Sequence, residues 1–195
     1  LIAGTRPEAV KLCPLIHALN VERDVEVQLC VTGQHRDIVS HVLDFFGIRA
    51  HYHLNLMVPG QGLNRLAARA LDLLDPILAE AAPDRVIVQG DTTTAFAAAL
   101  AAFHRAIPVA HVEAGLRTYE TALPFPEEVN RRTIAPIADL HFAPTPAARA
   151  NLVAERLAGA VYVTGNTGID ALQLVLARIA SDAAVRRAAD AALSV

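Results

Sequence analysis

The segment 86–118 constrains the fold of this chain more than any other, because it carries two strand patterns joined by a helix pattern. Its sequence is VIVQGDTTTAFAAALAAFHRAIPVAHVEAGLRT. The apolar run at 86–89 is typical of a strand that is buried on both faces of a parallel sheet. An alanine-rich helix pattern follows it, and a second apolar run begins at Pro108. The segment therefore predicts two parallel strands connected by a crossover helix.

Acidic residues follow both of these strands. Asp91 comes after the first strand and Glu113 after the second, with Arg117 a few residues further on. Ligands of open α/β sheets bind at the edge formed by the carboxyl ends of the strands. We therefore expect Asp91 and Glu113 to share a site there. Asp91 could instead serve only as a helix N-cap, whereas no helix pattern starts at Glu113.

The same alternation of strand and helix runs along the whole chain. Further strand patterns lie at 1–3, 25–32, 52–55, 140–143 and 161–165. Together they predict an α/β fold with a doubly wound parallel sheet. Prolines at 14 and 76 predict a kink or restart in two of the helices. The sheet pattern ends at 165–168, where helix patterns take over.

Both ends of the sequence look cut. Residues 1–3 match only the tail of a buried strand, and the last residues stop inside a helix pattern. We interpret the chain as a piece of a longer protein.

Composition excludes several classes of protein. The chain has 195 residues, is 53% hydrophobic and carries a net charge of −3, which allows one well-buried domain. It contains no basic cluster interleaved with aromatics, so nucleic-acid binding is not expected. No apolar run approaches the roughly 18 residues that a membrane span needs. Cys13 and Cys30 lie in apolar patterns without metal-ligand spacing, which indicates reduced thiols in a cytoplasmic protein.

The sequence GTRPEA at 4–9 places Gly4 directly after the first strand and a helix start directly behind it. Thr5 and Glu8 have the spacing of a capping box. Exposed backbone N–H groups, the helix dipole and Arg6 together would bind an anion such as a phosphate. The alternative is a tight turn with a solvated arginine.

A second pair of carboxylates, Glu127 and Glu128, follows Pro126 in the first turn of a predicted helix. The helix dipole alone favours acids at that position. Glu127 is nevertheless expected to face the same cleft as Asp91 and Glu113, because its loop also lies behind the carboxyl ends of the strands.

Two weaker patterns do not carry a function. The sequence GQGLNR at 60–65 lacks the third glycine of a dinucleotide fingerprint. His51 and His53 could project from one strand face as a metal pair, but no third ligand is near them in the sequence.

Taken together, the motifs of this chain resemble those of the non-hydrolysing UDP-N-acetylglucosamine 2-epimerases. The resemblance covers essentially the whole chain. The related hydrolysing enzymes tend to have GTRADY at the first motif, which this chain does not. The matching segments, in order, are GTRPEAVK (4–11), TGQHR (32–36), PGQGL (59–63), QGDTTT (89–94), HVEAGLRT (111–118), PFPEEVNR (124–131) and GNTGIDAL (165–172).

The resemblance implies a GT-B architecture, in which two Rossmann-like domains enclose an active site. Residues 1–165 would form the amino-terminal Rossmann-like domain, and 166–195 would begin the connection to a second domain. That second domain would carry most contacts to UDP, so this chain alone is expected to be inactive.

The resemblance also implies the reversible conversion of UDP-N-acetylglucosamine to UDP-N-acetylmannosamine. UDP is eliminated to give 2-acetamidoglucal and then returns, while the proton is delivered to the opposite face of carbon 2. This chemistry needs a base and an acid near carbon 2, and no redox or metal cofactor. By motif match the catalytic residues are Asp91, Glu113 and Glu127, with base and acid unassigned. The implied substrate-binding residues are Gly4, Thr5, Arg6, Lys11 and Arg117.

Further expectations come from the same resemblance. The nucleotide sugar could also act as an allosteric activator, bound near Gln34, His35 and Gln61. A cytoplasmic homodimer that serves cell-envelope polysaccharide biosynthesis is expected. Three alternatives stay open: a GT-B glycosyltransferase, a non-catalytic sugar-nucleotide binding module, and an epimerase for a different UDP-2-acetamido sugar.

Overall fold

The structure is a computed structural model, and it describes residues 1–33 and 36–193. Strands and helices alternate along the chain as the sequence predicts. In order they are β1 (Ile2–Ala3), α1 (Arg6–Asn20), β2 (Cys30–Val31), α2 (Arg36–Phe46), β3 (Tyr52–His53), α3 (Leu63–Ala81), β4 (Val86–Gln89), α4 (Thr93–His104), β5 (Val109–Val112), α5 (Glu127–Ile137), β6 (Leu140–Ala143), α6 (Pro146–Ala154), β7 (Ala160–Val163), α7 (Thr167–Ser181) and α8 (Ala183–Leu193).

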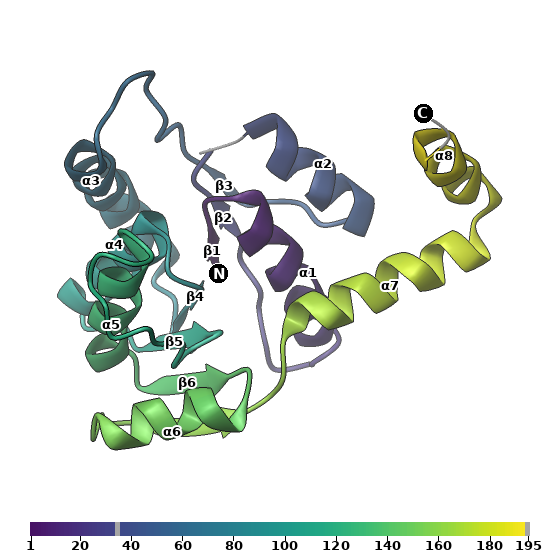
Figure 1. Cartoon of the computed structure of the whole chain (residues 1–195). Helices are drawn as coiled ribbons and strands as arrows, with labels where there is room; N and C mark the ends of the chain where they lie inside the picture. The colour runs from purple at the N-terminus through teal and green to yellow at the C-terminus, as the bar shows by residue number, and fades with distance from the viewer. Residues whose placement is uncertain (34–35, 194–195) are drawn as a thin grey trace.

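The strands pair in parallel within two groups. In the first group β2 lies between β1 and β3, and in the second β4, β5, β6 and β7 follow one another. β1 contacts β4 (Figure 1), so the spatial order is β3-β2-β1 followed by β4-β5-β6-β7. The direction of winding reverses between β1 and β4. In doubly wound folds that reversal point is where ligands bind.

The predicted parallel α/β fold is confirmed, with two corrections. Hydrogen-bonded ladders within the described residues define two groups of strands rather than one continuous sheet. The strand expected at 25–32 is reduced to Cys30–Val31. In the described part of the chain, residues 25–29 lie outside the ladder, and the N–H of Leu29 donates to the His51 side chain rather than to a backbone carbonyl.

The two prolines expected to interrupt helices, Pro14 and Pro76, do not end them. α1 continues through Pro14 and α3 continues through Pro76. Leu12 and Ile16 flank Pro14 and are buried, as are Leu74 and Leu78 around Pro76. Packing of the surrounding turns therefore holds the helical path across a residue that removes one backbone hydrogen bond.

The core is divided between the two faces of the sheet. α1 and α2 pack with one apolar cluster, while α3 and α4 pack with another that includes Val86 and Val88. α4 is buried along most of its length by small alanine side chains, which lets it approach its neighbours closely. Thr92 caps α4 by accepting the N–H of Ala95 at 3.0 Å. Asp91 is therefore not the cap, and its carboxylate is left for other partners.

Beyond β7 the chain continues as α7, which packs along α1 and leads to α8 away from the strands (Figure 1). The guanidinium of Arg178 on α7 lies 4.7 Å from the ring centroid of Phe45 on α2. Among the described residues, none of the helices combines the length and the hydropathy needed to cross a bilayer.

Candidate active site

The loops that follow β1, β4 and β5 meet where the winding of the sheet reverses. They carry Gly4 and Thr5, Asp91 and Glu113 respectively, and Arg6 begins the helix behind the first of them. The carboxylates lie close together: Glu113 and Glu127 both raise the pKa of Asp91 through their charge. A Cβ atom at Gly90, the residue before Asp91, would lie only 3.8 Å from Oε2 of Glu113.

Glu113 is held by two side chains from other elements. Lys11 Nζ on α1 donates to both carboxylate oxygens, at 2.7 Å for Oε1 and 2.6 Å for Oε2. The amide of Gln89, at the end of β4, donates to Oε2. The backbone of Glu113 has φ +66, a left-handed conformation that costs energy for a residue other than glycine. Strain of this kind is typical of functional positions. In this conformation the side chain of Glu113 reaches Lys11.

Asp91 is partly buried and faces cations and anions together. Burial raises the pKa of its carboxyl above the ordinary value, and Glu113 and Glu127 raise it further, while the positive charges of Arg131 and Lys11 oppose this. Arg131 Nη1 lies 3.2 Å from Oδ2 of Asp91. A carboxyl group with a raised pKa takes up a proton more readily, which suits a group that exchanges protons.

Glu127 and Glu128 begin α5 and have different surroundings. Glu127 is partly exposed, and its charge reaches Asp91. Glu128 is fully buried and accepts the backbone N–H groups of Thr118 at 3.0 Å and Tyr119 at 2.9 Å. The different burial of these adjacent carboxylates agrees with the choice of Glu127, rather than Glu128, as the candidate for the cleft.

The expected anion site at the start of α1 needs a correction. Glu8 is buried, and its Oε2 accepts the N–H of Gly4 at 2.9 Å and that of Thr5 at 2.5 Å. Its Oε1 accepts the hydroxyl of Thr92 at 2.7 Å. The predicted capping box is confirmed, but it uses the backbone donors that we expected to be free for a phosphate. Gly4 is required for another reason, since a Cβ there would lie 2.9 Å from Cβ of Thr94.

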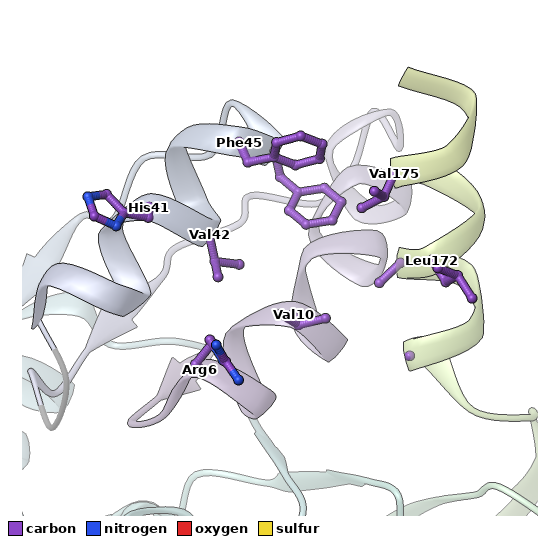
Figure 2. A pocket seen from close by; sticks show the side chains of 10 residues that line it. Arg6, Val10, His41, Val42, Phe45, Leu172 and Val175 are labelled. Carbon is purple, nitrogen blue, oxygen red and sulfur yellow. The ribbon is translucent and has the colours of Figure 1, made fainter. Parts of the chain in front are cut away.

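Arg6 remains exposed at the first position of α1 and lies at the edge of a cavity of about 680 Å³. Figure 2 shows this cavity between α1, α2 and α7, with Arg6 and Val10 on one side and Val42, Leu172 and Val175 around it. Its walls are mainly apolar. A ligand could therefore reach the Arg6 guanidinium from solvent.

Arg117 is placed elsewhere, and its expected contact with a substrate has no support from this placement. Its side chain is fully buried. Nε lies 2.7 Å from Oε1 of Glu155 and Nη2 lies 2.8 Å from Oε2. This bidentate pair ties the loop after β5 to the end of α6, so Arg117 serves the fold.

The residues expected to bind an effector are only partly covered by the structure. Gln34 and His35 lie outside the described residues. Gln61 is partly buried, and its amide donates to the carbonyl of Leu56 at 3.0 Å. Of the two histidines weighed as a metal pair, His51 accepts the N–H of Leu29 on its Nδ1 at 3.1 Å, which gives that nitrogen a structural role.

Sequence reasoning missed the contacts by which three residues organise the site. Gln89 holds Glu113, Arg131 reaches Asp91, and Glu128 holds Arg131. The spacing of Glu128 and Arg131 on one helix face was a signal for their pairing. Nothing in the sequence connected either residue to Asp91.

Comparison with known families agrees with the motif resemblance. The family model for UDP-N-acetylglucosamine 2-epimerase matches residues 17–193. The chain belongs to this epimerase family.

Individual epimerases are similar over almost the whole of this chain. The UDP-N-acetylglucosamine 2-epimerase of Escherichia coli K12 is 50% identical over 186 residues, which are 95% of this chain and 50% of that protein. The enzyme of the same name from Salmonella typhimurium is 51% identical over 179 residues, covering 91% and 48%. The chain therefore spans about half the length of these epimerases.

A solved epimerase structure has the same fold. The UDP-GlcNAc 2-epimerase of Neisseria meningitidis, determined with UDP-GlcNAc bound, superposes with a TM-score of 0.91 at 44% identity. The superposition covers 95% of this chain and 50% of that epimerase. The Rossmann-like fold of this chain is thus the fold of about half of that epimerase chain.

Proposed function

We propose that this chain forms the amino-terminal half of an enzyme that interconverts UDP-N-acetylglucosamine and UDP-N-acetylmannosamine. The observation that carries the proposal is the gathering of Asp91, Glu113 and Glu127 at the reversal point of the sheet. The family of the chain and the names of its relatives support the choice of substrate.

The proposed reaction begins with removal of the proton from sugar carbon 2. The electron pair of that C–H bond forms the double bond of 2-acetamidoglucal, and the bond from carbon 1 to the diphosphate oxygen breaks to release UDP. In the second half, the diphosphate oxygen attacks carbon 1 again, and a proton is added to the opposite face of carbon 2. One carboxylate acts as base and another group as acid.

The described residues suit these steps. Carboxylates beside the anomeric carbon would stabilise positive charge that develops as UDP leaves. The raised pKa of Asp91 fits a group that exchanges a proton. Arg6 and Lys11 on α1, with Gly4 and Thr5 shaping the turn that leads into this helix, would lie beside the leaving diphosphate. Lys11 would then exchange its contact with Glu113 for one with phosphate oxygens.

We also propose the larger organisation. Residues 1–165 would form one domain of a GT-B pair and 166–195 would begin the connection to the other, in a homodimeric cytoplasmic enzyme. The region of Gln34, His35 and Gln61 would bind the nucleotide sugar as an activator. Mass measurement in solution tests the dimer, and a sigmoidal dependence of rate on substrate that Gln61→Ala abolishes tests the activator site.

The decisive experiment incubates the longer protein that contains this chain with UDP-N-acetylglucosamine in heavy water. We expect deuterium at carbon 2 of both epimers and a trace of 2-acetamidoglucal. Loss of UDP without deuterium at carbon 2 would contradict epimerisation. A preparation of residues 1–195 alone should not turn over, since the proposed site needs an apposing domain.

A further inference from the structure

Glu128 lies against the proposed site but is sealed from it. The side chain is fully buried, with 0% exposed. Two backbone N–H groups, from Thr118 and Tyr119, donate to Oε2 and Oε1 respectively. Arg131 Nε and Nη2 approach Oε2 at 2.7 and 2.6 Å. A carboxylate with this set of donors is held in one orientation, because moving it would leave several buried donors unpaired.

Arg131 is fixed by this contact and extends beyond it. With Nε and Nη2 occupied by Glu128, the remaining Nη1 edge of the planar guanidinium faces Asp91, 3.2 Å from Oδ2. Only 9% of the Arg131 side chain is exposed, against 28% for Asp91. Of Glu128, Arg131 and Asp91, Asp91 is therefore the residue that a substrate can reach. Arg131 contacts it from the buried side.

A second link joins the same helix to Asp91. The side-chain amide of Asn130 donates to the backbone carbonyl of Asp91 at 2.9 Å. Both the backbone and the carboxylate of Asp91 are thus held from the first turns of α5. Glu128 also anchors the loop at Thr118 and Tyr119 to that helix, and its neighbour in the chain is the proposed catalytic Glu127.

A purely structural role is the alternative explanation for Glu128, since it closes the loop that leads to α5. That role would be satisfied by the contacts to Thr118 and Tyr119 alone. It does not account for a buried arginine whose third donor is aimed at a partly exposed carboxylate. The guanidinium of Arg131 must have a fixed orientation to hold the Asp91 carboxylate, and its contacts with Glu128 fix that orientation.

We propose that Glu128 and Arg131 are positioning residues for the epimerisation: Glu128 orients the guanidinium of Arg131, which holds the Asp91 carboxylate in place for proton transfer. The proposal rests on the proposed function. Neither residue touches the substrate, and their effect reaches the reaction only through Asp91.

Four charged groups face Asp91 from three elements, and they set the direction of the expected effect. They are Arg131 and Glu127 on α5, Glu113 beyond β5, and Lys11 on α1. Arg131 is the largest of the influences that lower the pKa of Asp91. If Arg131 no longer points at Asp91, burial and the charges of Glu113 and Glu127 raise the pKa of Asp91, and only Lys11 opposes them. Asp91 should therefore keep its proton to higher pH.

The test compares Glu128→Gln with Glu155→Gln in the longer epimerase that contains this chain. Glu155 is a matched control, because it also forms a bidentate pair with a buried arginine, Arg117, on a different part of the fold. We expect Glu128→Gln to lower kcat by about 10²-fold, as misplacement of a reacting group does, with a small change in KM. The limb of the pH–rate profile that reports the titration of Asp91 should move to higher pH. Glu155→Gln should lower the melting temperature but leave kcat and the pH–rate profile unchanged.

A Glu128→Gln enzyme with the kcat and pH profile of the unmodified enzyme would overturn the proposal. Should Glu128→Gln not fold, Arg131→Lys takes its place, since lysine keeps the charge but cannot span Glu128 and Asp91 in one plane. Unchanged kinetics in that variant would overturn the proposal equally. A titration of the Asp91 carboxyl by nuclear magnetic resonance separates this inference from the epimerase function. An unmoved Asp91 titration in both variants contradicts the positioning role, whereas absence of deuterium exchange in the unmodified enzyme contradicts the function.

Discussion

Lys11 and Glu113 form an ion pair across the point where the winding of the sheet reverses. Nζ of Lys11 lies 2.6 and 2.7 Å from the two oxygens of Glu113, although 102 residues separate them in the chain. The pair joins α1 to the loop after β5. It neutralises Glu113, whose side chain is 15% exposed, against 28% for Asp91. A phosphate group bound to Lys11 would compete with Glu113 for the ammonium group. The Glu113 carboxylate would then be less neutralised when positive charge develops at the anomeric carbon.

The first prediction concerns Glu113→Gln in the longer enzyme. Glutamine keeps the size of the side chain and can still accept from Lys11 and Gln89, but it has neither the charge nor the basicity. General acid–base groups contribute about 10²- to 10⁴-fold, and charge beside a developing cation adds to this. We expect deuterium incorporation at carbon 2 to be abolished while the thermal unfolding transition is retained. Normal incorporation by a folded variant would leave Asp91 and Glu127 to carry the reaction.

The placement of Glu113 and Asp91 could be predicted because it follows from local pattern. Apolar runs located the strands, parallel strands share a carboxyl edge, and both acids come directly after such runs. The capping box of Thr5 and Glu8 was predictable for the same reason, since both of its partners lie within one turn.

The partners of these residues could not be predicted in this way. Arg117 could point either toward the site or toward Glu155, depending on how the loop after β5 passes over α6. The conformation of Gly115 determines the path of this loop. With φ +89, this glycine brings the chain so close to α6 that a Cβ would lie 2.2 Å from the carbonyl oxygen of Ala148. Long-range pairs such as Arg131 with Asp91 depend on the packing of whole elements, which carries no short-range signal.

A second prediction tests that close approach through Gly115→Ala. Both Gly115 and Gly47 have positive φ, but a Cβ at Gly47 would meet no atom within 4 Å. Gly47→Ala should therefore cost only the left-handed conformation, about 1 to 2 kcal/mol. Gly115→Ala should cost more than this by about 1 to 3 kcal/mol, because the backbone of α6 must move. If urea unfolding showed the same loss of unfolding free energy for both variants, the predicted crowding of Gly115 against α6 would be contradicted.

The third prediction concerns the buried Glu8. Glu8→Ala would leave the N–H groups of Gly4 and Thr5 without their acceptor, and each unsatisfied buried donor costs about 1 to 3 kcal/mol. Glu8→Gln should be much milder. Its amide oxygen can accept both N–H groups, while its NH₂ donates to the hydroxyl of Thr92, which can act as an acceptor. Denaturant unfolding of the two variants measures the difference, and an alanine variant as stable as the glutamine variant would contradict the assigned bonds.

The last prediction concerns the pH dependence of stability and rests on His111. This side chain is buried in β5, and its Nε2 lies 2.7 Å from the carbonyl oxygen of Gly90. A carbonyl only accepts hydrogen bonds, so Nε2 carries the proton of a neutral ring. Burial lowers the pKa of His111 from 6.5 to about 4, with smaller opposing and reinforcing effects from the Gly90 bond and from His141 and Arg117.

A histidine whose pKa is lowered by folding binds its proton more readily in the unfolded chain. Its neutral form therefore stabilises the fold above pH 6.5, and this contribution is lost as the pH falls from 6.5 toward 4. The loss amounts to about 3 kcal/mol at about 1.4 kcal/mol for each pH unit. His111→Gln retains a donor for Gly90 but cannot titrate, so the difference in unfolding free energy between it and the unmodified chain should change by that amount between pH 7 and pH 4. His104→Gln, at the exposed end of α4, is the control and should run parallel to the unmodified chain. Parallel curves for His111→Gln as well would show that the buried ring does not control the acid sensitivity of the fold.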